Sequence, residues 1–243
     1  MTYSIKIKNK DLSSIKSGFV GATSVYSGLL SYYSTRRNLP DSLINLSTSS
    51  VDAVVNGAPT FTEQHAVVNK DNAITFRTNP NASASRTWAV IFRPLRTSGL
   101  TYPVGSFGLS PAVNGAEYLA LTGTSVIYEG ISFDPSTGAF AGVLRTTSTA
   151  LELNRYDLVV VRVVDQQKVD LLLPRLASTK TAATSSSLNY SASAANFRAA
   201  LSASTSDNEN ISMFAHWNRA LTDEEIAIFY AEQKEKFANV FSI

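Results

Sequence analysis

The sequence has no cysteine among its 243 residues and only two histidines. Disulfides and thiolate metal sites are therefore excluded, and few histidines are available for catalysis. Charged residues are also scarce, at 16%, and they nearly balance, because 21 Lys and Arg stand against 19 Asp and Glu. No basic stripe with interleaved aromatic residues occurs, so the sequence predicts no nucleic-acid partner.

Long apolar runs are missing as well. No stretch approaches the roughly 18 consecutive apolar residues of a membrane span, so we expect no membrane insertion. The N-terminal stretch from Met1 to Lys10 lacks the apolar centre of a signal peptide. We therefore expect the protein to be made in the cytoplasm of its host and to stay there unless another route releases it.

What the sequence does contain is a series of short β-strand patterns. They are rich in β-branched and aromatic residues and are bounded by Gly, Pro, Asn or Ser. The predicted strands are Ala73–Arg77, Thr87–Arg93, Glu117–Thr122, Val126–Ile131, Phe140–Thr146, Asp157–Val164 and Lys168–Leu173. A hairpin is predicted at Asp165-Gln166-Gln167. Short connections between consecutive strands predict an all-β fold, a two-sheet antiparallel β-sandwich of the jelly-roll type.

The stretch from Ile211 to Phe237 predicts a strand, a corner and one short C-terminal α-helix over residues 222–237. Residues 211–217 alternate with period two, as in a strand. Thr222 and Glu225 have the spacing of a capping box, in which each side chain accepts a hydrogen bond from the backbone of the other residue. Ile226 and Phe229 then give the helix an apolar face.

These segments resemble a known family. The run Asn218-Arg219-Ala220-Leu221-Thr222-Asp223-Glu224-Glu225-Ile226 resembles the C-terminal signature of concanavalin A-like lectin/glucanase domains of the laminin-G-like type. Asn56-Gly57-Ala58-Pro59 and the strand from Thr87 to Pro94 are similar to two further segments of that family. The resemblance covers roughly residues 29 to 238 and implies the sandwich. It does not choose among lectins, hydrolases and structural modules, which share this fold.

The first 28 residues differ from the rest and are predicted to form an N-terminal arm, followed by the sandwich over residues 29–243. Tyr3, Ile5 and Ile7 alternate with polar and basic residues, which is the pattern of a short strand. Such a strand can attach a domain to the sheet edge of another chain. We therefore predict that Tyr3, Ile5 and Ile7 make an assembly contact.

The alternation also predicts the core. On each predicted strand one set of side chains must face the second sheet. The residues expected to share that interior are Trp88, Val90, Phe92, Val159, Val161, Val163, Met213 and Trp217.

No catalytic residues are predicted. Glycoside hydrolysis needs two carboxylates facing each other across the substrate, whereas Glu117, Glu129, Glu152 and Glu209 are isolated in the sequence. A Gly-x-Ser-x-Gly motif is absent. His65 is read as a solvated loop residue and His216 as a strand residue at the rim of the core.

Two sets of binding residues are predicted, and each has a structural alternative. Lectins of the family that the sequence resembles often hold Ca²⁺ through oxygen ligands, which makes Asp207, Asn208 and Asn210 the candidate metal ligands. The same residues are also typical of a turn. The candidate carbohydrate-binding residues, or alternatively structural ones, are Tyr102, Tyr118, Tyr128 and Tyr190. No other cofactor is predicted.

These observations predict a non-enzymatic structural or adhesive module of a large assembly, a bacteriophage virion protein in the head decoration, tail or baseplate. Its expected partners are other virion proteins or copies of itself, together with surface glycans, and its expected location is the virion. The alternatives are a free carbohydrate-binding lectin and a glycoside hydrolase with an unrecognised pair of acids. Loss of assembly on removal of the arm would distinguish the first reading from the other two.

Overall fold

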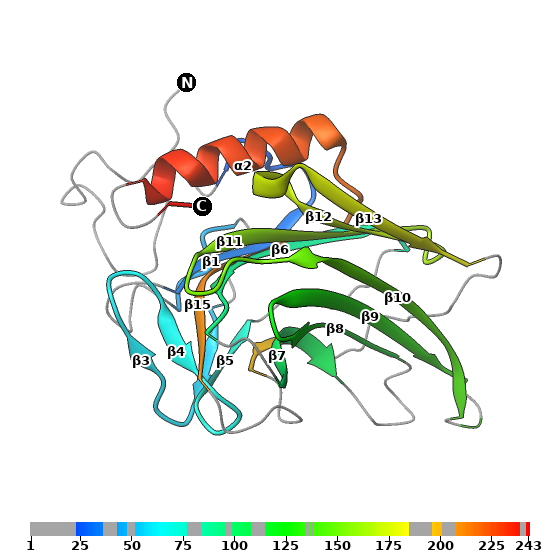
Figure 1. Cartoon of the computed structure of the whole chain (residues 1–243), viewed down its shortest axis with the longest axis horizontal. Coiled ribbons are helices and arrows are strands. Elements are labelled where there is room, and N and C mark those ends of the chain that lie inside the picture. The colour runs from blue at the N-terminus through cyan, green and yellow to red at the C-terminus, as the bar shows by residue number, and fades with distance from the viewer. Residues whose placement is uncertain are drawn as a thin grey trace.

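The fold consists of three layers. The computed structural model of the chain describes residues 23–35, 43–47, 52–76, 84–95, 99–107, 115–134, 137, 139–184, 196–200, 208–238 and 242–243. Within these residues the strands form two antiparallel sheets, one of eight strands and one of seven. The same residues include one α-helix, α2 (Asp223–Phe237). Figure 1 shows α2 above the eight-stranded sheet, with the seven-stranded sheet below it. The predicted antiparallel sandwich with one C-terminal helix is confirmed.

The eight-stranded sheet contains the most apolar strands. In spatial order its strands are β13 (Ser178–Ala183), β12 (Lys168–Leu173), β11 (Asp157–Val164), β6 (Arg86–Arg93), β15 (Glu209–Trp217), β4 (Ala66–Val68) and β3 (Thr60–Phe61). The eighth strand, β1 (Leu29–Ser34), pairs with the second half of β15. A 3-10 turn, η2 (Pro174–Leu176), connects β12 to β13. The bounds of β11 and β12 are those predicted from the sequence.

The seven-stranded sheet closes the other side of the sandwich. Its strands in spatial order are β10 (Phe140–Ala150), β9 (Ser125–Phe133), β8 (Gly115–Thr122), β7 (Leu100–Phe107), β14 (Phe197–Ala199), β5 (Ala73–Phe76) and β2 (Val54–Asn56). The sequence did not predict β7, because Pro103 and Gly105 interrupt its pattern and are both unfavourable inside strands.

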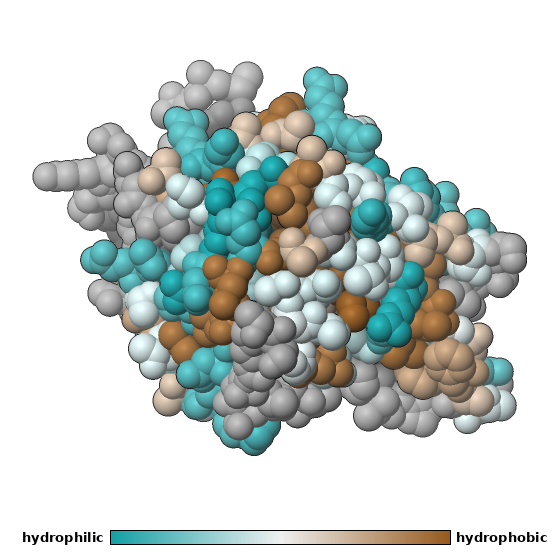
Figure 2. All heavy atoms as spheres, viewed as in Figure 1, coloured by the Kyte–Doolittle hydropathy of each residue, from teal (hydrophilic) through white to brown (hydrophobic). Residues whose placement is uncertain are grey.

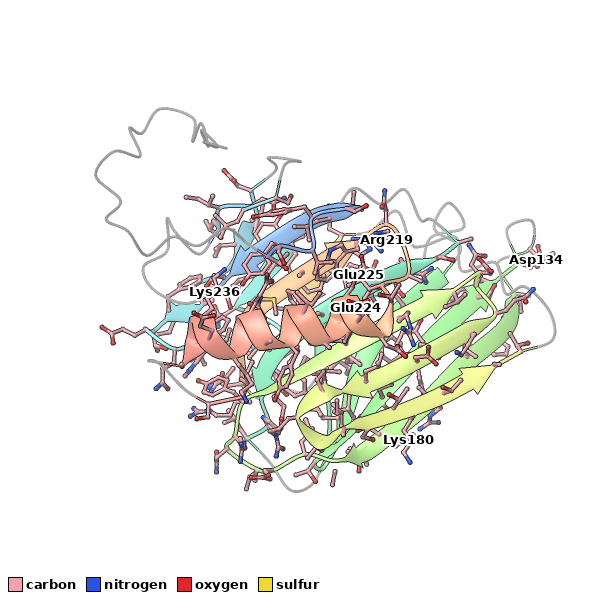
Figure 3. The ribbon with its side chains drawn as sticks, turned by 90° about the horizontal axis from the view of Figure 1, so that it is seen from above. Asp134, Lys180, Arg219, Glu224, Glu225 and Lys236 are labelled. Carbon is pink, nitrogen blue, oxygen red and sulfur yellow. The ribbon has the colours of Figure 1, made fainter. Side chains whose placement is uncertain are left out.

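Local sequence signals explain the turn between β11 and β12 and the start of α2. In the three-residue turn between β11 and β12, Asp165 and Gln166 have φ angles of 50° and 56°, and the Gln167 N–H donates to the Val164 carbonyl at 3.0 Å. The capping box is also present, since Thr222 Oγ1 accepts from the Glu225 N–H at 3.2 Å and the Glu225 carboxylate accepts from the Thr222 N–H at 2.9 Å. Figure 3 shows Arg219 beside Glu225 at this first turn, with Lys236 at the far end of α2.

Aromatic side chains fill the space between the two sheets. Phe197 of the seven-stranded sheet packs against Trp88 and Phe214 of the other sheet, with ring centroids 5.1 Å apart in both pairs. Phe214 also stacks on Phe76 at 4.6 Å. The predicted core residues on β6 and β11 lie in this cluster: Trp88, Val90, Phe92, Val159, Val161 and Val163.

A second core lies between the eight-stranded sheet and α2. Trp217 meets Phe229 of the helix edge to face, with ring centroids 5.0 Å apart, and Met213 belongs to the same cluster. The prediction that Met213 and Trp217 share an interior with Trp88 is therefore wrong. The cause is a register shift between Ile211 and Met213, a bulge that moves the following side chains to the opposite face of the sheet.

The last residues of the predicted arm contact this second core. Thr23 Oγ1 and the Ser24 N–H donate to the Glu232 carboxylate of α2, at 2.5 and 2.9 Å. Trp217 Nε1 donates to the Val25 carbonyl at 2.9 Å, and the Val25 side chain is buried. The predicted assembly residues Tyr3, Ile5 and Ile7 lie outside the described residues. In the described part of the chain no helix combines the length and apolar character needed to cross a bilayer.

Candidate functional site

The outer face of the seven-stranded sheet brings together side chains that the sequence scatters over several strands. Leu119 and Tyr128 belong to the core between the sheets. Since side chains alternate along a strand, their neighbours Tyr118 and Glu129 point outward. Arg145 on β10 pairs in register with Glu129 on β9, so it shares this outer face. The strand pairing therefore positions an aromatic, an acidic and a basic side chain side by side.

Contacts link these side chains into one cluster. The Tyr102 and Tyr118 rings meet edge to face, with centroids 5.3 Å apart. The Tyr118 hydroxyl donates to the Glu129 carboxylate, and Arg145 Nε lies 3.1 Å from Glu129 Oε1. We call Tyr102, Tyr118, Glu129 and Arg145 the tyrosine face. The sequence had proposed Tyr102 and Tyr118 but missed Glu129 and Arg145, which only the pairing of β8, β9 and β10 brings to them.

The four side chains of the tyrosine face differ in their exposure to solvent. The Arg145 side chain is 55% exposed, Glu129 and Tyr102 are half-buried, and Tyr118 is nearly covered. Burial, reinforced by the hydrogen bond to Glu129, raises the pKa of the Tyr118 hydroxyl well above its usual range. Tyr118 therefore stays a neutral phenol that donates to Glu129. This hydrogen bond fixes the orientation of the Glu129 carboxylate.

Apolar side chains border the tyrosine face. Tyr102 and Ile131 pack against a small cluster of Ala116, Tyr118, Ala120 and Ile127. Phe140, at the start of the edge strand β10, is 63% exposed, and Val143 is also exposed. Figure 2 shows hydrophobic side chains gathered at the lower right, over the ends of β9 and β10 in Figure 1, with hydrophilic ones beside them. Such a mixture suits a ligand with apolar C–H patches and many hydroxyls.

The remaining predicted sugar-binding residues do not join this face. Tyr128 points inward and is fully buried, where its hydroxyl donates to Glu117 at 3.2 Å. Its ring therefore offers no surface to a ligand. Tyr190 lies outside the described residues.

The predicted metal ligands are committed to other partners. Asn208 Oδ1 accepts from Asn69 Nδ2 at 3.0 Å. Asn210 is buried and, with its amide oxygen turned toward Arg93, accepts from Arg93 Nη2 at 2.6 Å. Asp207 lies outside the described residues. Among the described residues, no three His, Cys, Asp or Glu side chains gather closely enough to hold a metal ion.

The acids considered for hydrolysis are also engaged. Glu117 points inward and pairs with Arg86, whereas Glu129 points outward from the same sheet, so these two carboxylates cannot flank one substrate. Glu152 pairs with Arg175 at 2.6 Å and with Arg155 at 3.2 Å.

Both histidines lie where the sequence predicted, His65 in a loop and His216 on a strand, but both are buried. His65 is buried rather than solvated, and its Nδ1 is hydrogen-bonded to the Tyr156 hydroxyl. Burial, with a smaller effect of Arg93, lowers its pKa to about 4. His216 lies inside the sandwich, where burial lowers its pKa to about 4 as well. Within the described residues neither ring nitrogen of His216 has a hydrogen-bond partner.

The architecture defines a two-sheet antiparallel β-sandwich domain with one C-terminal helix. No protein-family model matches the sequence, and no curated protein does. Solved structures do match. The receptor-binding domain of the botulinum neurotoxin C/D mosaic serotype is 12% identical, with a TM-score of 0.65 over 85% of this chain and 51% of that chain.

Two further neurotoxin structures give the same result. The botulinum neurotoxin serotype D binding domain is 13% identical, with a TM-score of 0.65 over 87% of this chain and 53% of that one. A type C structure, described by the dependence of cell entry on two ganglioside molecules, is 11% identical, with a TM-score of 0.62 over 84% of this chain and 51% of that one. The chain thus spans about half the length of these proteins. At identities this low, the similarity shows a shared fold and nothing further.

Proposed function

We propose that this chain is an adhesive module that binds glycans through the tyrosine face. The observation that carries the proposal is the edge-to-face pair of Tyr102 and Tyr118 beside the Glu129–Arg145 ion pair on a solvent-facing sheet. An aromatic ring can pack against the C–H face of a sugar, while a carboxylate accepts from hydroxyls and a guanidinium donates to them. Binding of this kind needs no chemical step.

The structural neighbours support the choice of ligand class. One of them is described by its interaction with ganglioside molecules and another by a complex with SialylT. The neighbours support only the view that a sandwich of this shape can carry a glycan-binding site. The location of the proposed site is inferred from the residues of this chain alone.

The test is binding of the purified chain to a panel of immobilised glycans, followed by calorimetry with any glycan that is retained. Tyr102→Ala and Arg145→Gln change partly exposed side chains, so both variants should fold normally. We expect each to weaken binding by at least about tenfold, equivalent to about 1.4 kcal/mol. Tyr26→Ala is the matched control, because Tyr26 is an exposed tyrosine outside the tyrosine face. Retention of no glycan, or equal binding by all three variants, would overturn the proposal.

Membership of a bacteriophage virion is a finer part of the same proposal, and the sequence alone supports it. It depends on Tyr3, Ile5 and Ile7 attaching the sandwich to other virion proteins or to further copies of the chain. Deletion of residues 2–17 should leave a folded domain that no longer enters the particle. Normal incorporation of the truncated protein would remove this part of the proposal and leave glycan binding untouched.

A further inference from the structure

Arg93 and Arg198 differ from the other described arginines because each binds a neutral group. All of the others pair with a carboxylate; these are Arg86, Arg145, Arg155, Arg162, Arg175 and Arg219. Arg93 instead binds a neutral amide, with Asn210 Oδ1 accepting from Nε at 3.1 Å and from Nη2 at 2.6 Å. Arg198 likewise donates to a neutral group, the Lys70 carbonyl, at 2.7 Å. Within the part of the chain that the structure describes, no carboxylate pairs with either of these two guanidinium groups.

The surroundings of Arg93 distinguish it from Arg198. The Arg93 guanidinium lies over the Tyr156 ring, 5.2 Å from its centroid, and the Tyr156 hydroxyl is hydrogen-bonded to His65 Nδ1. Tyr156, His65 and Asn210 are all buried. Arg93 is therefore a half-buried cation held between a ring and an amide, beside a neutral imidazole.

The strand register explains how these groups meet. Arg93 at the end of β6 pairs with Asn210 on β15. On the other side of β6, Asp157 pairs with Phe92, so Tyr156 precedes β11 next to Arg93. Ile91 and Tyr156 belong to the core under α2, so by alternation Arg93 is on the α2 side of the sheet. The tyrosine face lies on the outer side of the other sheet, which makes the two places independent.

We propose that Arg93, together with His65, forms an anion-binding site for the carboxylate or phosphate group of an acidic ligand. A guanidinium presents a rigid, planar set of N–H donors that matches the oxygens of either group. In Arg93 the amide of Asn210 uses Nε and Nη2, which leaves Nη1 to donate to an anion. A partly desolvated cation without a counter-ion is unfavourable, and a bound oxyanion would supply that counter-ion.

The imidazole of His65 provides a direct readout. An anion beside His65 favours the protonated ring, so binding must raise the pKa of His65 from its low value. The described groups that act on this ring are Arg93 and Tyr156. Because the chain has only two histidines, NMR resolves them as two titrating signals. His216 serves as the internal reference, since it faces the opposite side of the eight-stranded sheet and contacts Phe197.

The experiment titrates the full chain with inorganic phosphate and, separately, with glucuronate, and follows both imidazole signals by NMR. We expect the His65 signal to shift at least with one of the two anions and the His216 signal to stay in place. Arg93→Gln should weaken the response by at least about tenfold, while Arg198→Gln should leave it unchanged. The anion that binds more tightly identifies the source of the charge, a phosphorylated or a carboxylated ligand.

A second variant keeps the test decisive if Arg93→Gln folds poorly. Asn210→Asp places a carboxylate at hydrogen-bond distance from Arg93 and supplies the missing counter-ion from within the chain. We expect this variant to fold, to raise the pKa of His65 without added anion, and to lose the response to phosphate and glucuronate. A response of the same size in Asn210→Asp or Arg93→Gln, or no response to either anion in the natural chain, would overturn the anion site. Glycan binding at the tyrosine face would be unaffected by any of these outcomes.

Discussion

Arg86 and Glu117 join the two sheets of the sandwich through parallel hydrogen bonds, Nε to Oε1 and Nη2 to Oε2, both 2.9 Å long. Arg86 begins β6 in the eight-stranded sheet and Glu117 lies on β8 in the other sheet. Their side chains are only 1% and 3% exposed. The pair thus crosses the core next to the Tyr128 hydroxyl and is almost completely shielded from solvent.

Removal of one member of this pair should be far more damaging than removal of both. Glu117→Gln leaves the Arg86 charge buried without its partner, which costs about 3–5 kcal/mol. The double variant Arg86→Met, Glu117→Leu should lose much less stability than the sum of the single changes. Chemical denaturation of the four proteins in a double-mutant cycle measures the coupling. Additive losses would contradict a buried, mutually dependent pair.

The capping box makes a prediction about α2. Thr222→Ala should lower stability by about 1 kcal/mol, and Thr222→Ser, which keeps the hydroxyl, should cost much less. Glu225 adds a pH dependence. Arg219 first, and then the hydrogen bonds with Thr222, lower the pKa of Glu225 to about 2. Its contribution is complete above its unfolded pKa of roughly 4.5 and is lost as the pH falls toward 2. Denaturation at several pH values should show this loss, and Glu225→Gln should show none of it.

The two histidines predict a second pH effect, at higher pH. Burial lowers the pKa of both rings to about 4 in the folded chain, whereas the unfolded chain titrates near 6.5. Between these values the unfolded state binds more protons, so stability must fall as the pH drops from about 6.5 to about 4. His216→Phe should reduce this slope and leave stability at pH 7 nearly unchanged, because the buried ring nitrogens have no described partner. Denaturation curves at pH 5 and pH 7 provide the comparison; an unchanged slope would contradict a neutral buried His216.

Gly57 is predicted to tolerate no side chain. Its φ is +74°, and a Cβ atom there would lie 2.1 Å from the backbone oxygen of Asp71. Gly57→Ala therefore combines strain of about 1–3 kcal/mol with a forced backbone shift. Gly28 is the matched control, with a φ of +76°, because the closest atom there belongs to the movable Asn218 side chain. Thermal unfolding should show a clearly larger loss for Gly57→Ala than for Gly28→Ala.

The sequence predicted those elements whose signals are local. β11 and β12 are rich in Val and Leu and are joined by a short polar turn, and α2 begins at a capping box that four consecutive residues reveal. Each of these signals depends on neighbours along the chain. No other part of the structure is needed to read them.

Features that depend on pairing between distant strands were not predictable. The bulge between Ile211 and Met213 leaves no mark on the alternation, yet it determines which core receives Trp217. The tyrosine face likewise depends on β7, β8, β9 and β10 lying next to one another, and the irregular sequence of β7 concealed one of them. His65 does lie in a loop, as predicted, but nothing in the sequence indicated its burial, because its partner Tyr156 follows 91 positions later.

The position of β15 has a consequence for synthesis on the ribosome. This strand pairs with β6, β4 and β1, so until β15 is made the eight-stranded sheet consists of three unconnected parts: β13-β12-β11-β6, β4-β3 and β1. Leu29 and Trp217 are register partners, although nearly the whole chain separates them. A nascent chain that ends before residue 209 therefore exposes open strand edges and the apolar surface that α2 later covers. Pairing at such long range is slow, and open edges favour aggregation. Completion of the eight-stranded sheet must accordingly wait until β15 has left the ribosome.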